Sequence, residues 1–165
     1  MDQIVIGVKR RGRPSERIIR GAMIFFAVFF LLQGIMFSTG FMLPCFLMAA
    51  AYYWYRHSSK KEYEYTLEDG WMAIDRVSDS GRRRLHEFPL ADVKYLTLPD
   101  DPLVAPYRKG GTEKIKKFDY TSYEEDVPYY TMIVEQTGAR AKFLLDLTPE
   151  ALRYIRHHSR GTVRF

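Results

Sequence analysis

Residues 21–55 form an apolar run without any Asp, Glu, Lys or Arg, although the sequence on both sides of it is densely charged. A single membrane-spanning helix needs roughly 20 apolar residues, so these 35 residues are too many for one span and nearly enough for two short ones. The turn-forming residues Ser38, Thr39 and Gly40 divide the run. The sequence therefore predicts a two-helix transmembrane hairpin within residues 21–57, with helices at about 21–37 and 41–55.

The basic residues beside this run predict its orientation. Residues 1–20 carry six Lys or Arg side chains, Arg56, Lys60 and Lys61 follow the run, and the turn carries none. The positive-inside rule places such flanks in the cytoplasm. We therefore expect a multi-pass protein of the cell (plasma) membrane with both termini cytoplasmic. Residues 1–20 are then a basic cytoplasmic segment, and the basic flanks contact the anionic lipid of the bilayer.

A secretory signal peptide is an alternative interpretation of the N-terminal part. It has a basic region, an apolar region and small residues at the cleavage site, here Ser38 and Gly40. The apolar region of a signal peptide usually has about 7–15 residues. The run in this chain is longer and a second apolar stretch follows at once, which favours the hairpin.

The distribution of charge bears on nucleic-acid binding. The net charge is +5, but residues 1–61 contribute +7 and residues 62–165 contribute −2. The basic residues thus belong to the membrane flanks, which favours anionic lipid over nucleic acid as their partner. One alternative stays open, because Arg11, Gly12, Arg13 and Pro14 resemble the core of minor-groove DNA-binding arms.

Residues with catalytic or metal-binding chemistry are sparse. Cys45 is the single cysteine and lies in the second apolar stretch, so the chain has no disulfide framework and no cysteine-based zinc site. The four histidines have no metal-ligand spacing, and the sequence has no phosphate-loop motif. We therefore predict no catalytic residue, no cofactor, no metal site and no enzymatic activity.

Residues 62–165 are predicted to form one mainly antiparallel β domain with a C-terminal helix, which makes the chain α+β. Residues 62–68 alternate between Tyr or Leu and polar side chains, the pattern of a half-buried strand. Turn residues separate the further expected strands, and Thr148 and Pro149 are a good N-cap and first residue for the helix. The strands expected after residues 62–68 are residues 71–78, 82–88, 90–98, 129–136 and 139–147.

This order of elements is the outline of the pleckstrin-homology (PH) superfold. The chain resembles small bacterial membrane proteins in which a two-helix hairpin precedes a PH-like domain, most closely an uncharacterised family found in clostridial relatives. The residues that carry the resemblance are Tyr63–Gly70, Phe88–Val93 and Leu147–Glu150. These residues are signatures of the fold and not of a site, so the resemblance implies the architecture. The chain departs from phosphoinositide-binding PH domains, whose first hairpin is basic, because the expected first turn here is the acidic Glu68–Gly70.

Residues 100–127 interrupt the strand pattern as a long insertion. Structureless loops of this length are uncommon in compact domains unless they are functional or disordered. Basic residues interleaved with aromatics suit an acidic peptide, a lipid headgroup or single-stranded nucleic acid. The alternative is a mobile insertion with one extra strand near Ile115–Phe118. The candidate residues for binding a partner or headgroup are Tyr107, Arg108, Lys109, Lys114, Lys116 and Lys117.

Two further charged groups are weaker candidates. Arg82, Arg83 and Arg84 follow a predicted turn and are suited to gripping phosphates, although such a run is usually a solvated face. Residues 124–126 are three consecutive acids, which we interpret as a solvated loop.

Two functions fit these features. The first is a membrane-tethered PH-like adaptor at the cytoplasmic face, where a barrel edge or the long loop binds a protein partner. The second is a structural accessory subunit of a larger membrane complex, with the hairpin as its assembly surface and Gln33 as a polar contact in it.

Overall fold

The computed structural model describes residues 3–12, 14–59 and 61–165 and divides the chain into two compact units. One unit is Arg11–Lys61, and the other joins the described part of Met1–Arg10 to Glu62–Phe165. Arg13 and Lys60, two basic residues of the expected membrane flanks, lie outside the described residues.

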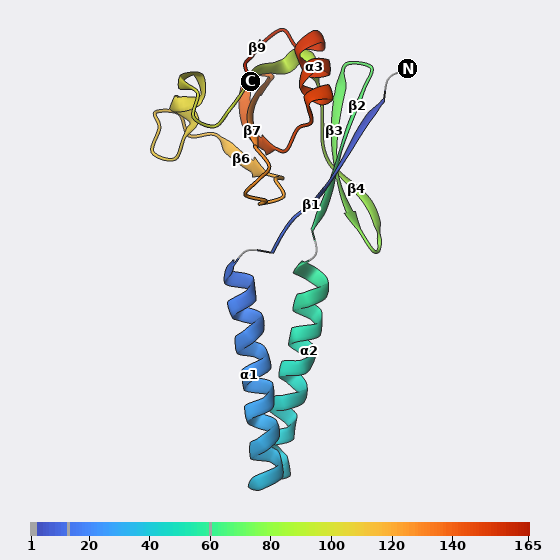
Figure 1. Ribbon diagram of the computed structural model, residues 1–165, viewed down its shortest axis with the longest axis vertical. Coiled ribbons are helices and arrows are strands. Elements are labelled where there is room, and N and C mark those ends of the chain that lie inside the picture. Colours follow the sequence, from blue (N-terminus) through green and yellow to red (C-terminus); the bar gives the residue numbers. More distant parts are fainter. Residues whose placement is uncertain (1–2, 13, 60) are drawn as a thin grey trace. The chain divides into compact units, whose positions relative to one another are not determined.

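The unit Arg11–Lys61 consists of two helices, α1 (Pro14–Met36) and α2 (Met42–Ser59), joined by a short 3-10 turn at Thr39–Phe41 (Figure 1). The Ser38 hydroxyl accepts a hydrogen bond from the Gly40 N–H at 3.3 Å and so caps this turn. A Cβ atom on Gly34 would lie 2.9 Å from Cγ of Met42. Glycine at this position therefore lets the two helices approach closely where the chain turns.

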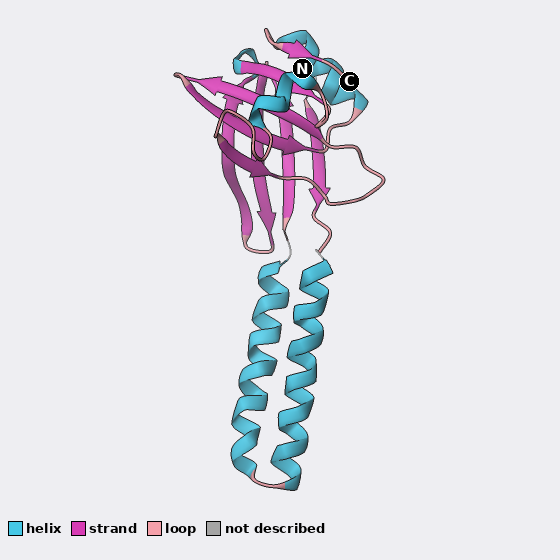
Figure 2. Cartoon of the chain, turned by 90° about the vertical axis from the view of Figure 1, so that its left-hand side faces the viewer, coloured by secondary structure: helices cyan, strands magenta, loops and turns pink. Residues whose placement is uncertain are grey.

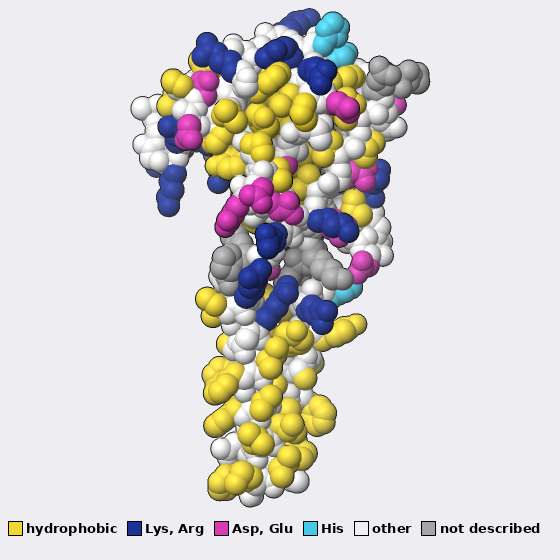
Figure 3. Space-filling view, viewed as in Figure 1, with side chains coloured by type: hydrophobic (Ala, Val, Ile, Leu, Met, Phe, Trp, Pro, Cys, Tyr) yellow, Lys and Arg dark blue, Asp and Glu magenta, His cyan; other side chains and the backbone are white. Residues whose placement is uncertain are grey.

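The side chains of these helices are mostly apolar and exposed. By length and composition, Ser15–Met36 is the one stretch among the described residues that could cross a membrane, and little of it is buried within the chain. Figure 3 shows hydrophobic side chains over the visible face of both helices. The exposed large side chains include Phe25, Phe29, Leu32, Ile35, Phe46, Leu47, Tyr53 and Trp54.

The other unit contains two β-sheets (Figure 2). The first sheet is antiparallel, with β1 (Ile4–Lys9), β2 (Glu62–Glu68), β3 (Trp71–Ser78) and β4 (Gly81–Pro89) in that order. β1 and β2 pair along their whole length, from Ile4 opposite Leu67 to Lys9 opposite Glu62. In the sequence, the two helices therefore lie between two strands that are neighbours in one sheet.

β1 was not expected from the sequence. Its residues belong to the stretch 1–20, which was predicted to be a basic segment without a strand. Ile4, Ile6 and Val8 alternate with more exposed residues, so one face of the strand packs on the core. Its strand partner follows only after the two helices, and local patterns carry no information about such a distant pairing. Glu68–Gly70 joins β2 to β3, which are the second and third strands of this sheet.

The second sheet has the order β6-β8-β7-β5-β9. β5 (Val93–Thr97), β7 (Tyr130–Gln136) and β8 (Ala139–Leu145) pair antiparallel. The two outer strands, β6 (Lys116–Asp119) and β9 (Thr162–Val163), pair parallel to their neighbours β8 and β5.

The core lies between the sheets and helix α3 (Pro149–His158). Tyr65, Met72, Leu96 and Leu145 are among its fully buried side chains. The Thr148 hydroxyl accepts from the Ala151 N–H at 3.3 Å, which caps α3, and Leu152 and Ile155 of α3 are buried. Two mainly antiparallel sheets with a C-terminal helix agree with the expected α+β, PH-like fold.

Much of the segment 100–127 is packed. A 3-10 helix, Pro102–Tyr107, lies on the face of the second sheet that points away from the core, and Val104 and Tyr107 pack on Ile133 there. A Cβ atom on Gly111 would lie 2.2 Å from the Pro106 carbonyl oxygen, so only glycine allows the chain to close back on the helix. We call residues 98–115 the flap.

Candidate functional site

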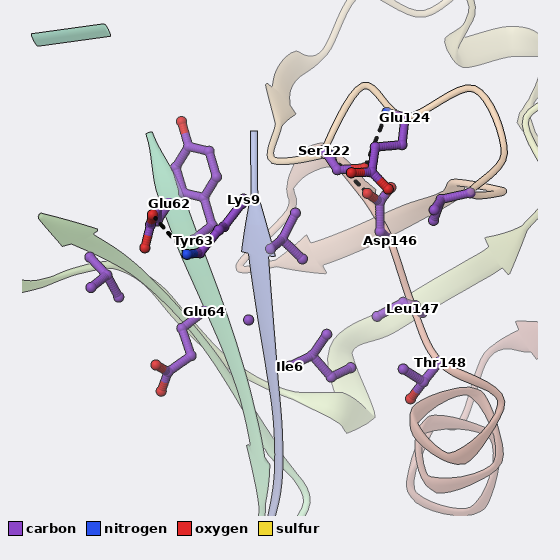
Figure 4. Close-up of a pocket in the computed structure, with 14 residues that line it drawn as sticks. Ile6, Lys9, Glu62, Tyr63, Glu64, Ser122, Glu124, Asp146, Leu147 and Thr148 are labelled. Atoms are coloured by element: carbon purple, nitrogen blue, oxygen red, sulfur yellow. Dashed lines mark hydrogen bonds and ion pairs between the residues drawn. The ribbon is translucent and has the colours of Figure 1, made fainter. Parts of the chain in front are cut away.

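A groove of about 500 Å³ runs beside β1. Ile6–Lys9 and Glu62–Glu64 form one side of it, and Ser122, Glu124 and Val127 with Asp146–Thr148 form the other. Figure 4 shows Ile6 pointing from β1 toward Leu147, and Asp146 and Ser122 facing the groove from the opposite wall.

The backbone of β1 is open on the groove side. β1 is the outermost strand of its sheet. Within the described residues, Ile4–Lys9 makes its strand-pairing backbone hydrogen bonds to β2 and no others. An edge strand with free N–H and C=O groups is a template for adding another strand. The groove therefore offers both backbone hydrogen bonds and side-chain contacts to an extended segment.

Arg10 fixes the end of β1 against the opposite wall. Its Nε donates to the Thr121 carbonyl at 3.2 Å, and its Nη2 lies 3.3 Å from Oδ1 of Asp119 and also donates to the Asp119 carbonyl. The guanidinium lies 5.1 Å from the ring centre of Tyr63 and 4.5 Å from that of Tyr123. Only 14% of the Arg10 side chain is exposed. Arg10 is therefore a packed residue of the unit that contains the two sheets, which we call the PH-like unit.

Buried hydrogen bonds hold the opposite wall in place. Oδ2 of the buried Asp146 accepts from the Ser122 N–H at 2.7 Å, and the Tyr65 hydroxyl donates to the Tyr120 carbonyl at 2.7 Å. Burial, followed by the charge of Asp146, raises the pKa of Tyr65 well above its ordinary value. Tyr65 is therefore a neutral donor at physiological pH, and the wall is formed before any ligand binds.

The polar lining of the groove is mainly acidic. Glu62, Glu64, Glu124 and Asp146 line it, against one lysine, Lys9. Lys9 Nζ lies 3.6 Å from Glu62, and Glu64 pairs with an arginine of β4 at 2.6 Å. Glu124 is exposed and is followed by two more exposed acids. With the apolar side chains of the lining, this arrangement suits an extended segment that carries basic and apolar residues.

The structure separates the candidate residues of the insertion. Arg108, Lys109 and Lys117 line a pocket of about 220 Å³ on the outer face of the second sheet, and Lys142 of β8 joins them. Tyr107 is buried in the small cluster beneath the flap, and its hydroxyl lies 3.3 Å from Nη1 of Arg140.

Lys114 and Lys116 line a different opening, of about 500 Å³, beside β4 and β6. His86 lies in this opening, with ring centres 4.3 Å from Phe118 and 5.0 Å from Phe143. Burial lowers the pKa of His86 below 6.5, so its ring is neutral at physiological pH.

Arg82, Arg83 and Arg84 lie on β4 and join neither group of lysines. Arg82 pairs with Glu64 at 2.6 Å, and Arg84 pairs with Asp75 at 3.0 Å and with Glu87 at 2.9 Å. Two of the three charges are thus balanced by carboxylates of the same sheet. Among the described residues, no group of three or more His, Cys, Asp or Glu side chains is placed to hold a metal ion.

The groove was not predicted from the sequence, because one of its walls is the unpredicted β1. The available signal was the β-branched run at residues 4–8, which favours a strand. Lys142 was also missed, since its place in the pocket depends on the parallel pairing of β6 with β8.

Comparison with known proteins gives one match. The model of a family described as bacterial PH-like domain (DUF6106) matches residues 4–165, from the start of β1 to the C-terminal residue. No curated protein and no solved structure matches the chain.

Proposed function

Because the chain belongs to the bacterial PH-like domain family DUF6106, we propose that it is a non-enzymatic binding module anchored in the cell membrane by α1 and α2. The narrower resemblance, to clostridial proteins with a two-helix membrane hairpin, is part of this proposal. The groove beside β1 is the binding site, and an extended segment of a protein partner is its ligand.

The pairing of β1 with β2 supports a hairpin with two crossings. Lys9 and Glu62 are opposite each other in one sheet, and the helices lie between them in the sequence. If α1 crosses a bilayer, the chain must cross again before it reaches β2, and α2 is the helix available. The 23 residues of α1 span about 35 Å, and the 18 residues of α2 span about 27 Å, which a locally thinner bilayer accommodates.

The flanking charges support a cytoplasmic position for the PH-like unit. Arg11, Arg17 and Arg20 precede the apolar part of the helices, and Arg56 and Lys61 follow it. Their positions beside the apolar part favour contact with anionic lipid and retention of both ends in the cytoplasm.

The charge and open backbone of the groove support its choice of ligand. Lys9 and Arg82 pair with Glu62 and Glu64, and the exposed Glu124 with the two acids that follow it favours a segment with Lys or Arg. The free edge of β1 favours an extended conformation. The single observation that carries the proposal is this acidic groove along the open edge of β1. Anchoring confines the module to the membrane surface, so a weak site captures a partner that is also held there.

A crosslinking experiment in cells tests the proposal. A photo-reactive amino acid replaces Val127, which lines the groove, in the full-length chain. A matched control carries it at the exposed Leu98, outside the groove. We expect crosslinks from position 127 to one basic, extended segment, and their loss when Glu124→Lys and Glu125→Lys reverse the charge of the wall. Crosslinks that survive this charge reversal, or that reach only acidic segments, would contradict the proposal.

An accessory subunit is the second candidate function. The observation in its favour is the exposed apolar surface of the helices. Such a surface packs against the helix of a partner protein as readily as against lipid. Exchanging Phe25, Phe29 and Leu32 for other apolar residues of similar size would then abolish assembly, whereas the charge reversal at Glu124 and Glu125 would leave it intact.

A further inference from the structure

The pocket on the outer face of the second sheet gathers positive charge from two distant parts of the chain. Lys117 of β6 and Lys142 of β8 are Cα partners in a parallel pair, so their side chains leave the same face side by side. Arg108 and Lys109 join them from the flap, in a volume of about 220 Å³. Like charges in such direct opposition destabilise a sheet, so the arrangement calls for an explanation.

No carboxylate compensates for this charge at close range. Among the described residues, the acid that lines the pocket is Asp100, whose side chain is fully exposed and whose Oδ1 lies 4.0 Å from Nη2 of Arg108. Other basic residues of the same sheet lie close to a carboxylate. Lys94 Nζ lies 2.9 Å from Oε2 of Glu135, and Arg140 Nη1 lies 2.7 Å from Oε2 of Glu113. The pocket therefore differs from the places in the same sheet where basic side chains face carboxylates at close range.

Two of the four basic groups are held by hydrogen bonds to backbone carbonyls, whereas Lys109 and Lys117 are exposed. Nζ of Lys142 donates to the Tyr107 carbonyl at 3.1 Å, and Nε of Arg108 donates to the Pro99 carbonyl at 3.1 Å. Partial burial, and then the neighbouring charges of Lys117 and Arg108, lower the pKa of Lys142. The fold thus keeps a partly desolvated ammonium group among other cations.

A second, independent feature of the pocket is an unsatisfied hydroxyl. Thr131 of β7 lines the pocket and is fully buried, and its Oγ1 has no hydrogen-bond partner among the described residues. A buried polar group without a partner costs about 1–3 kcal/mol, so native proteins rarely keep one without a reason. Hydroxyl and ammonium groups together are donors for the oxygen atoms of an anion.

We propose that this pocket, lined by Arg108, Lys109, Thr131 and Lys117 with Lys142, binds a phosphate group. The volume fits one phosphate with part of what it is attached to. The phosphate belongs to a lipid headgroup or to a soluble phosphate, two sources with the same recognition chemistry. The site shares no lining residue with the groove beside β1. Phosphate binding can therefore be tested independently of the protein ligand proposed for the groove.

The test uses the full-length chain, purified in a non-ionic detergent and in phosphate-free buffer. Equilibrium dialysis measures the binding of inorganic phosphate. Native mass spectrometry measures retention of dioleoyl phosphatidic acid, with dioleoyl phosphatidylcholine as the reference lipid. The test variant is Lys117→Gln with Lys142→Gln. The matched control is Lys114→Gln with Lys116→Gln, which removes the same number of charges from another opening.

We expect the wild type to bind at least one of the two phosphate probes. The affinity falls by about tenfold or more in the test variant, through the loss of charge-assisted hydrogen bonds, and changes little in the control. Retention of phosphatidic acid alone identifies a headgroup site, and binding of inorganic phosphate identifies a site that also accepts soluble ligands.

Thermal unfolding separates loss of the site from loss of the fold. Phosphate, or phosphatidic acid, is expected to raise the Tm of the wild type and of the control but not that of the test variant. The test variant should itself unfold cooperatively without the ligand. Binding of neither probe by the wild type, or an equal loss of binding in both variants, would overturn the proposal, as would undiminished binding by the test variant.

Discussion

Arg10, which follows β1, forms an ion pair with Asp119, the last residue of β6. The guanidinium Nη2 lies 3.3 Å from the Asp119 Oδ1, and most of the Arg10 side chain is buried. The same guanidinium also donates to the Thr121 carbonyl, so one side chain ties the end of β1 to the chain around residues 119–121. A residue expected to flank a membrane helix is instead a structural contact of the domain.

Replacing Arg10 should therefore destabilise the domain. Arg10→Gln leaves the partly buried Asp119 without its charged partner, and we expect a loss of about 2 kcal/mol in the free energy of unfolding. Arg11→Gln is the matched control, because Arg11 is exposed, and it should change the free energy by less than about 0.5 kcal/mol. Denaturant unfolding, followed by Trp71 fluorescence in a Trp54→Phe background, measures both. Equal stability of the two variants would mean that the Arg10 contacts contribute nothing.

The register of β1 and β2 predicts that the helices can be removed without loss of the domain. Lys9 opposes Glu62, so Arg10 and Lys61 can be joined by a two-residue Asn-Gly turn in place of the intervening residues. We expect a soluble, folded protein with a dispersed NMR spectrum. The control is residues 62–165 alone, where β2 becomes an unprotected edge strand and aggregation is expected. A well-folded control would show that β1 is dispensable.

His86 predicts a pH dependence of stability. Its pKa in the folded chain lies below 6.5, since burial among aromatic rings disfavours the charged ring. The unfolded state then binds more protons than the folded state between the two pKa values, so stability falls as the pH is lowered through this window. His86→Phe removes the titratable ring and should make the stability depend less on pH in this window. Tm measured against pH for both proteins checks it, and identical profiles would exclude His86 as the cause.

Lys142 provides a direct test of the charge in the pocket. The neighbouring charge of Lys117 is one of the causes that lower its pKa, so Lys117→Gln should raise the pKa of Lys142 toward 10.5. Lys116→Gln is the control, because Lys116 opposes Ala141 and not Lys142. NMR titration of the lysine Nζ groups measures both. A pKa of Lys142 that does not respond to Lys117→Gln would mean that the two ammonium groups lie apart in solution.

Patterns of short range account for the elements that the sequence predicted. The alternation at residues 62–68 and the cap at Thr148 depend on neighbours in the chain, and the strand β2 and helix α3 match them. β6 overlaps the extra strand expected near Ile115–Phe118, but its parallel partner was not predicted. β1 and β9 depend on partners elsewhere in the chain and were not predicted. Short apolar runs leave such pairings open, because the free energy that selects them comes from tertiary packing.

The candidate site divides in the same way. The basic residues of the insertion could be singled out by composition, since charge and aromatic content are local properties. Their grouping could not: Lys117 and Lys142 meet only through the register of β6 and β8, while Lys114 and Lys116 face another opening. The groove beside β1 requires an edge strand and two distant loops, so it emerges only from the folded sheet.

The connectivity around α1 and α2 makes a final prediction about topology. β1 and β2 are neighbours in one sheet, so a membrane-spanning α1 requires a second crossing, and the turn at Ser38–Gly40 then lies on the opposite side from both strands. Cys45 is the single cysteine, so a Cys45→Ala background allows single reporters to be placed. Thr39→Cys should react with a membrane-impermeant maleimide in intact cells, and Ser58→Cys should react only after lysis. Labelling of both positions only after lysis would mean that the helices enter the bilayer without crossing it. Such a non-crossing hairpin would also let β2 pair with β1, so the strand pairing alone does not distinguish the two arrangements.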